Sequence, residues 1–170
     1  LFERVLADSI RVLGEDHPNS LTSRNNLAGA YESEGRLAEA IALFERVLAD
    51  SIRVLGKEHP DTLASCNNLA HAYHAEGRFT EAIALYEQLL ADSIRILGEN
   101  HPDTLISRNN LAGAYRSAGR LDESITLYEL VRADCTRVLE PDHPITTTVH
   151  ENLEAARRAL EQQEGQSLPE

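Results

Sequence analysis

Apolar residues recur every three or four positions along the chain, in blocks separated by glycine or by a His-Pro pair. From Thr62 to Gly77 the apolar residues are leucine, alanine and tyrosine set among polar ones, a spacing typical of an amphipathic helix. After Arg78, the segment from Phe79 to Gly98 carries larger aliphatic and aromatic residues at the same spacing. The pattern predicts two consecutive helices, called helix A and helix B below, each followed by a glycine that ends it.

This pair of helices repeats along the chain every 42 residues. The His-Pro pair before each helix A occurs four times at that spacing, and the first fourteen residues recur unchanged from Leu43 to Gly56. A period of this length is typical of a solenoid, in which each helix pair buries its apolar face only against its neighbours. We therefore expect an all-α fold of stacked antiparallel helix pairs. The histidines of the four His-Pro pairs are His17, His59, His101 and His143.

Small and aromatic residues recur at the apolar positions of both helices. The alanines allow two helix backbones to approach closely, and the aromatic rings fill the space around them. Because their spacing matches the inward-facing positions, we predict that the aromatic residues form the core and do not stack on a ligand. They are Tyr31, Tyr73 and Tyr115 of helices A and Phe44, Tyr86 and Tyr128 of helices B.

The period also predicts how the chain is organised. The first fourteen residues form a helix B without its own helix A, and the chain starts without methionine, so we expect a piece of a longer regulatory or adaptor protein. The last helix A carries Glu154 and Arg157 where other units have alanine and tyrosine, which gives a terminal unit a polar outer face. The predicted segments are an orphan helix B (1–14), three repeats (15–56, 57–98 and 99–140), a capping helix (141–163) and a disordered tail (164–170).

Charge and composition exclude several classes of partner. The formal net charge is −12, whereas a general nucleic-acid binder needs a basic face to neutralise phosphate. No apolar run approaches the roughly 20 residues that span a bilayer, so we expect no membrane partner. Cys66 and Cys135 stand at different positions of the repeat, which argues against a disulfide framework and fits a reducing cytoplasm.

Several spaced motifs carry a family resemblance. Asn-Leu-Ala-x-Ala-Tyr, then Gly-Arg, then Glu-Ala-Ile-x-Leu-Phe/Tyr resemble the tetratricopeptide repeat over about residues 1–160. The 42-residue form, with Leu-Gly-x-x-His-Pro-Asp-Thr-Leu and Asn-Asn-Leu-Ala, is similar to the repeats of kinesin light chains and their bacterial relatives. The resemblance implies a right-handed superhelical solenoid in which helices A line a concave groove and helices B form the convex back. It also implies a scaffold that binds proteins.

Asparagine pairs recur on helix A, and the resemblance directs attention to them. A side-chain amide both donates and accepts hydrogen bonds, so a ladder of amides can bind the backbone of an extended peptide whatever its side chains. The second asparagine of each pair, at Asn26, Asn68 and Asn110, occupies the position that contacts peptide backbone in related repeats. For the first asparagine, ligand binding and a tie between adjacent helices both remain open. These first asparagines are Asn25, Asn67 and Asn109.

Two histidines of the central helix A differ from their counterparts in the other repeats. His71 and His74 lie one turn apart on one helix face, where they could contact an acidic ligand, sense pH or hold a metal. A metal needs more ligands than two imidazoles, and Glu32 is the one nearby carboxylate that could join them. We therefore expect neither a metal nor another cofactor; the two histidines are included among the predicted ligand contacts, and exposed histidines with no ligand remain the alternative.

Arginines supply positive charge on helix A. Arg24 and Arg108 stand where the family commonly has tryptophan, and Arg116 takes the position of His74 in the next repeat. Acidic residues populate helix B instead. We expect the three arginines to contact an extended peptide with acidic or aromatic character.

The sequence carries no catalytic motif. The four His-Pro histidines cannot converge on one ion, because successive units are separated by helix contacts of roughly 8–10 Å each, and we expect them to organise loops. The sequence also lacks a glycine-rich phosphate loop, a Cys/His metal spacing and a nucleophile in a recognisable setting. We therefore expect no enzymatic activity.

Three functions are compatible with this pattern. The first is a protein-protein interaction scaffold that binds a peptide or partner segment in the concave groove. The second is a self-assembling array, since exposed edges of interchangeable units can stack or swap between chains into a homo-oligomer. The third is a small-molecule sensor in which His71, His74, Arg116 and the asparagines form a polar pocket.

Overall fold

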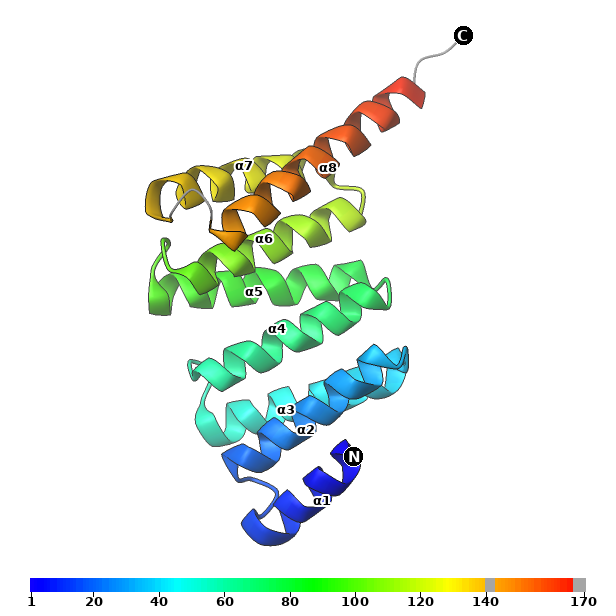
Figure 1. The fold of residues 1–170 in the computed structure, drawn as a ribbon, viewed down its shortest axis with the longest axis vertical. Helices are drawn as coiled ribbons and strands as arrows, with labels where there is room; N and C mark the ends of the chain where they lie inside the picture. The colour runs from blue at the N-terminus through cyan, green and yellow to red at the C-terminus, as the bar shows by residue number, and fades with distance from the viewer. Residues whose placement is uncertain (140–142, 167–170) are drawn as a thin grey trace. The chain divides into compact units, whose positions relative to one another are not determined.

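The computed structural model describes residues 1–139 and 143–166, which form eight α-helices and no strand. The all-α fold class is thereby confirmed. Helices B are α1, α3, α5 and α7, and helices A are α2, α4, α6 and α8 (Figure 1). Their bounds are α1 Phe2–Leu13, α2 Pro18–Ser33, α3 Leu37–Leu55, α4 Pro60–Ala75, α5 Phe79–Leu97, α6 Pro102–Ser117, α7 Leu121–Val138 and α8 Pro144–Gln166.

The chain divides into two compact units, residues 1–85 and residues 86–170. In unit 1, α1 packs on α2, α2 on α3 and α3 on α4, and the two helices A of this unit, α2 and α4, also touch. In unit 2, α6 packs on α7 and α7 on α8, and α6 touches α8. Each unit is therefore built from consecutive helix pairs, as the periodicity predicts. The division into repeats at 15–56, 57–98 and 99–140 stays a prediction.

Each helix A begins at a histidine that caps it. The Nδ1 atom of His59 accepts a hydrogen bond from the backbone N–H of Asp61 at 3.2 Å, and the three other His-Pro histidines make the equivalent bond at 3.1–3.2 Å. The proline that follows lacks an N–H, so it removes one donor that the first turn of a helix would leave without a partner. These histidines organise the loops, as predicted.

The helices A of the three full repeats end at a glycine, and α8 does not. Gly35, Gly77 and Gly119 have φ of +76°, +82° and +77°, a left-handed conformation that residues with a Cβ rarely adopt. The equivalent residue in the last helix is Glu161, and α8 continues through it to Gln166. Residues 164–166 are therefore helical, which corrects their assignment to the tail. The rest of that predicted tail, 167–170, lies outside the described residues, as does the 140–142 boundary.

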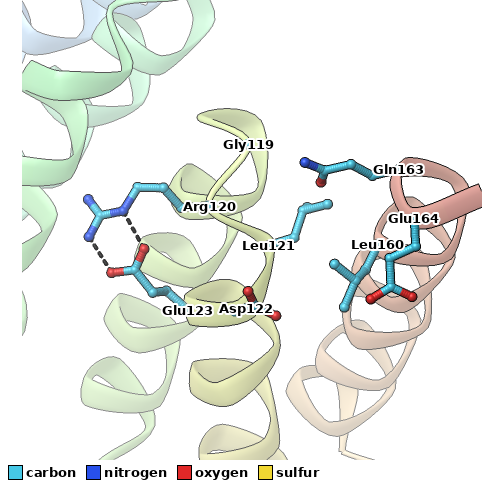
Figure 2. A pocket seen from close by; sticks show the side chains of 8 residues that line it. All are labelled: Gly119, Arg120, Leu121, Asp122, Glu123, Leu160, Gln163 and Glu164. Carbon is cyan, nitrogen blue, oxygen red and sulfur yellow. Dashed lines mark hydrogen bonds and ion pairs between the residues drawn. The ribbon is translucent and has the colours of Figure 1, made fainter. Parts of the chain in front are cut away.

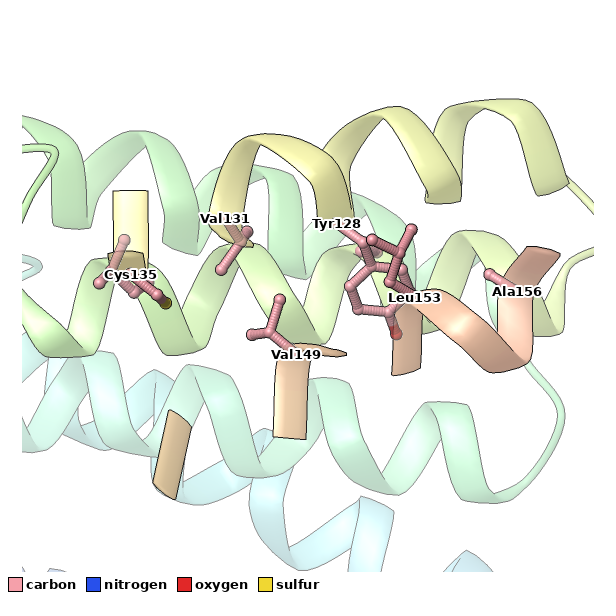
Figure 3. Close-up of a cluster of buried hydrophobic side chains, with 8 residues drawn as sticks. Tyr128, Val131, Cys135, Val149, Leu153 and Ala156 are labelled. Carbon is pink, nitrogen blue, oxygen red and sulfur yellow. The ribbon is translucent and has the colours of Figure 1, made fainter. Parts of the chain in front are cut away.

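The core of each unit contains the predicted alanines and most of the predicted aromatic rings, together with leucine, isoleucine and valine side chains. In unit 1, Phe44 is 2% exposed and Tyr73 9%. In unit 2, Tyr128 and Val131 of α7 pack against Leu153 and neighbouring apolar residues of α8 (Figure 3). The core assignment is confirmed for four of the six aromatic residues, Phe44, Tyr73, Tyr86 and Tyr128, whereas Tyr31 and Tyr115 are half-buried.

Within the described part of the chain, no helix is both long and apolar enough to cross a membrane.

Candidate functional site

A hollow of about 600 Å³ lies over α2 in unit 1. Most of its lining comes from the second half of α2, with single residues from α1, α3 and α4. Two of the predicted ligand contacts, Asn26 of α2 and Asn68 of α4, line it together although they belong to different repeats. Phe44 of α3 contributes an aromatic side chain to the wall. This hollow therefore joins the polar faces of two successive helices A.

The asparagines form direct bonds between successive helices A. The Nδ2 atom of Asn68 donates to Oδ1 of Asn25 at 3.2 Å, which links α4 to α2. In unit 2, Asn152 of α8 donates to Asn109 of α6 at 3.1 Å in the same way. Asn25 and Asn109 thus tie helices together, which was one of the two open alternatives, and Asn68 belongs both to this tie and to the hollow.

The second asparagines differ in exposure. Asn26 is exposed, whereas Asn68 and Asn110 are half-buried. Asn152 stands at the same repeat position, 42 residues after Asn110, and the sequence analysis missed it as a member of this series. The 42-residue period was the pattern from which it could have been found.

The two histidines of α4 have different surroundings. The Nδ1 atom of His71 lies 2.7 Å from Oε1 of Glu32 on α2, so this pair bridges the same two helices as the asparagines. The His74 ring instead packs on the ring of Phe79, with centroids 5.5 Å apart and planes tilted by 59°. Residues 1–139 and 143–166 contain no group of three or more His, Cys, Asp or Glu side chains arranged to hold a metal ion.

Arg24 and Arg108 do not contribute charge to a binding surface. Arg24 is 3% exposed, and its Nη1 atom lies 2.7 Å from Oδ2 of Asp50 on α3. Arg108 is likewise buried and forms an ion pair with Asp134 on α7. Because a buried guanidinium must be paired, each arginine is held by the helix B of its own repeat. The expectation that these two arginines contact a ligand is therefore corrected. Arg116, in the last turn of α6, is half-buried.

A second hollow, of about 380 Å³, lies in unit 2 between the start of α7 and the end of α8 (Figure 2). Figure 2 shows Leu121 facing Leu160, with Gln163 and Glu164 on the α8 side. These α8 residues follow the point at which the other helices A have ended, so the hollow results from the absence of the terminating glycine. It contains none of the predicted ligand contacts.

The model of the tetratricopeptide repeat family matches this chain over residues 1–50, 24–91, 62–129 and 108–164. The chain belongs to the tetratricopeptide repeat family. Proteins of this family generally mediate protein-protein interactions, and they are typically non-enzymatic. The expected class of function is thus supported at the level of the family.

Solved structures agree with this assignment. The kinesin-light-chain-like, nearly identical TPR-like repeats from Podosopora anserina are 38% identical, with a TM-score of 0.81, and the match covers 97% of this chain and 79% of that one. BtubC (BKLC) from P. vanneervenii is 23% identical, with a TM-score of 0.80 and coverage of 94% and 63%, a likeness that shows the fold alone. No match was found among curated proteins. The predicted resemblance to kinesin-light-chain-like repeats is confirmed.

A tyrosine–glutamate contact recurs in this tetratricopeptide array and was not anticipated. The hydroxyl of Tyr73 donates to Oε1 of Glu45 on the preceding helix B at 2.6 Å, while the guanidinium of Arg78 lies 4.2 Å from the centroid of the tyrosine ring. Burial, followed by this hydrogen bond, raises the pKa of Tyr73 to about 12. The equivalent tyrosines, Tyr31 and Tyr115, make the same two contacts.

The last repeat replaces this hydrogen bond by an ion pair. Arg157 stands at the tyrosine position of α8, and its Nη2 atom lies 2.7 Å from Oε1 of Glu129 on α7. The substitution that the sequence analysis took as a polar capping feature therefore also preserves the contact between helix A and the preceding helix B.

Proposed function

We propose that this chain is a protein-protein interaction scaffold that binds an extended segment of a partner protein along the polar face of its helices A. The observation that carries the proposal is the hollow of unit 1, in which Asn26 and Asn68 of successive repeats meet. Its volume is in the range of pockets that hold a small ligand or a few side chains of a peptide.

The amides suit the backbone of an extended peptide. Each side-chain amide offers a donor and an acceptor, and these match the C=O acceptor and the N–H donor of a peptide unit. The bond from Asn68 to Asn25 fixes the orientation of the Asn68 amide before any ligand arrives. A contact group held in place in this way loses less conformational entropy on binding.

The proposed contacts are a smaller set than the sequence suggested. They keep the second asparagines, the two α4 histidines and the arginine at the end of α6, and they omit the two buried arginines. The retained residues are Asn26, Asn68, His71 and His74 in unit 1 and, as a separate set, Asn110 and Arg116 in unit 2. Cys66 and Cys135 are buried and do not form a disulfide, which is consistent with the proposed location in a reducing cytoplasm.

Partner capture with matched variants tests this function. Asn26→Ala removes an exposed amide that lines the hollow, and Asn19→Ala removes an exposed amide from the first turn of the same helix, outside the hollow. Both variants should melt like the parent chain. We expect a partner protein retained from a native lysate by the parent and by Asn19→Ala to be lost with Asn26→Ala. Equal retention by all three would contradict binding at the hollow.

Self-association is a second candidate function, favoured by the apolar surface of α1. Phe2 and Val5 are 44% and 45% exposed, whereas Phe44 and Val47, at the same positions of α3, are 2% and 1% exposed. Apolar side chains that are exposed one turn apart on a helix are candidates for a contact with another chain. Sedimentation equilibrium of the parent and of Val5→Lys tests it, with a concentration-dependent mass expected for the parent alone. A monomer at all concentrations would contradict it.

A further inference from the structure

The hollow of unit 1 is acidic. Glu32 and Glu34 line it, and its lining contains no lysine, arginine or histidine. The Glu34 side chain is 61% exposed and that of Glu32 is 21% exposed, so one carboxylate is reached directly from solvent and the other lies deeper. The hollow thus presents amides to the backbone of a bound peptide and negative charge to the side chains of that peptide.

Each of these carboxylates has one neighbouring group that offers a hydrogen bond. Glu32 is bonded to an imidazole, His71, which can donate a hydrogen bond from Nδ1 without carrying a charge. Glu34 lies 3.2 Å from Arg36, but this guanidinium is already engaged by Glu39 through two hydrogen bonds of 2.7 Å and 2.5 Å. Two carboxylates, Glu34 and Glu39, therefore share one arginine beyond the end of α2.

Arg24, the arginine of α2, adds no compensating charge. Arg24 is buried and paired with Asp50, so its charge is balanced inside the helix pair. The chain as a whole carries a formal net charge of −12, which attracts cations and repels acidic segments at long range. These facts favour a cationic segment over an acidic one at this hollow, because the expectation of an acidic ligand depended on arginines at the groove.

We infer that the hollow of unit 1 binds an extended cationic peptide segment, with lysine or arginine side chains beside Glu32 and Glu34 and its backbone on the amides of Asn26 and Asn68. This inference rests on the proposed function and adds the chemical class of the partner. Phe2, 44% exposed at the edge of the hollow, offers an apolar surface for the stem of a lysine or arginine and a ring face for its charge.

Two synthetic peptides test the inference. Both are acetylated and amidated ten-residue peptides of one neutral sequence, with lysine at alternate positions in the first and glutamate at the same positions in the second. Binding to the full 170-residue chain is measured by fluorescence anisotropy. We expect the lysine peptide to bind at least about tenfold more tightly than the glutamate peptide, and its binding to weaken as salt is raised.

Isosteric variants localise the effect. Glu32→Gln and Glu34→Gln remove charge while keeping an acceptor oxygen, and each should weaken the lysine peptide by about three- to tenfold. The matched control is Glu76→Gln, because Glu76 holds the position of Glu34 in the next repeat and pairs with Arg78, but it does not line the hollow. This control should leave the affinity unchanged.

The outcomes separate this inference from the proposed function. Equal binding of both peptides, with weakening by Asn26→Ala, would overturn the charge assignment and leave a peptide-binding hollow. Equal weakening by Glu76→Gln and Glu34→Gln would show diffuse attraction by the net charge and would also overturn the inference. Failure of Asn26→Ala to affect either peptide or the captured partner would contradict the proposed function itself.

Discussion

At the scale of single residues, the same repeat position has different roles according to its neighbours. Asn26 and Asn68 are equivalent in the repeat, and both line the hollow of unit 1. Asn26 is exposed, whereas Asn68 also donates to Asn25 across two helices A. Asn68 is therefore expected to take part both in the proposed binding and in the stability of the fold, whereas Asn26 is expected to take part in binding alone.

This difference predicts different effects on stability. Asn68→Ala should lower the free energy of unfolding by about 0.5–1.5 kcal/mol, because it breaks a partly buried hydrogen bond. Asn26→Ala should change that free energy by less than about 0.5 kcal/mol, as is usual for an exposed substitution. Urea denaturation of both variants measures the two values. Equal destabilisation by the two variants would show that Asn26 is also structural.

Two substitutions of Tyr73 distinguish the contribution of packing to stability from that of hydrogen bonding. Tyr73→Ala should cost about 3–5 kcal/mol, because it removes a buried ring between helices. Tyr73→Phe keeps the ring and removes only the bond to Glu45, so it should cost about 1 kcal/mol. The same denaturation experiment distinguishes them. A loss in Tyr73→Phe as large as in Tyr73→Ala would assign the stability to the hydroxyl group.

The raised pKa of Tyr73 predicts a dependence of stability on alkaline pH. The folded chain holds the phenol proton more tightly than the unfolded chain, whose ordinary pKa is 10.0. The resulting stabilisation is complete below pH 10 and is lost as the pH rises toward about 12. Tyr73→Phe should therefore lose less stability than the parent between these pH values. Parallel unfolding curves measured from pH 9 to 12 would contradict this.

Residues with local partners were predictable from the sequence, and those with distant partners were not. The His-Pro histidines bond to a backbone N–H two residues away, so their loop role follows from sequence alone. The partner of Arg24 is 26 residues away and that of Asn68 is 43 residues away. The face of helix A that packs on helix B depends on how the helices are arranged in space. The sequence alone therefore does not distinguish an arginine that is buried against helix B from one that faces the groove.

At the scale of the helix, the ends are set by single residues. A glycine in the left-handed conformation ends α2, α4 and α6, and its replacement by Glu161 allows α8 to continue. This continuation creates the second hollow, in unit 2. The periodic pattern predicted the helices themselves, but the predicted end of the capping helix was wrong because the missing glycine was not taken into account.

The histidine caps can be tested at the start of α4. His59→Ala should lower the free energy of unfolding by about 1 kcal/mol, because the N–H of Asp61 loses its side-chain acceptor. His59→Asn should retain most of the stability, since asparagine is among the preferred capping residues. Thermal melting of both variants measures the difference. Equal melting of His59→Ala and the parent would show that the cap contributes nothing.

At the scale of the whole molecule, membership of the tetratricopeptide repeat family accounts for the fold, and the polar faces of helices A account for the proposed recognition. The residues that support this proposed recognition lie mainly in unit 1. It joins amides of two repeats and the carboxylates of Glu32 and Glu34 in one hollow, and the bond between Glu32 and His71 links the same two helices A. The asparagines recur in every repeat, whereas Glu32 is replaced by His74 and Arg116 at the equivalent positions, so its carboxylate distinguishes this hollow from the rest of the array.

Titration of the isotope-labelled chain with the lysine peptide, followed by nuclear magnetic resonance of the backbone and side-chain amides, tests recognition at this hollow most directly. The account predicts that the largest shifts fall on Asn26, Asn68 and their neighbours lining the hollow, and that Asn19 and the end of α8 are unaffected. Shifts centred on the α8 hollow, or no shift at all, would contradict it.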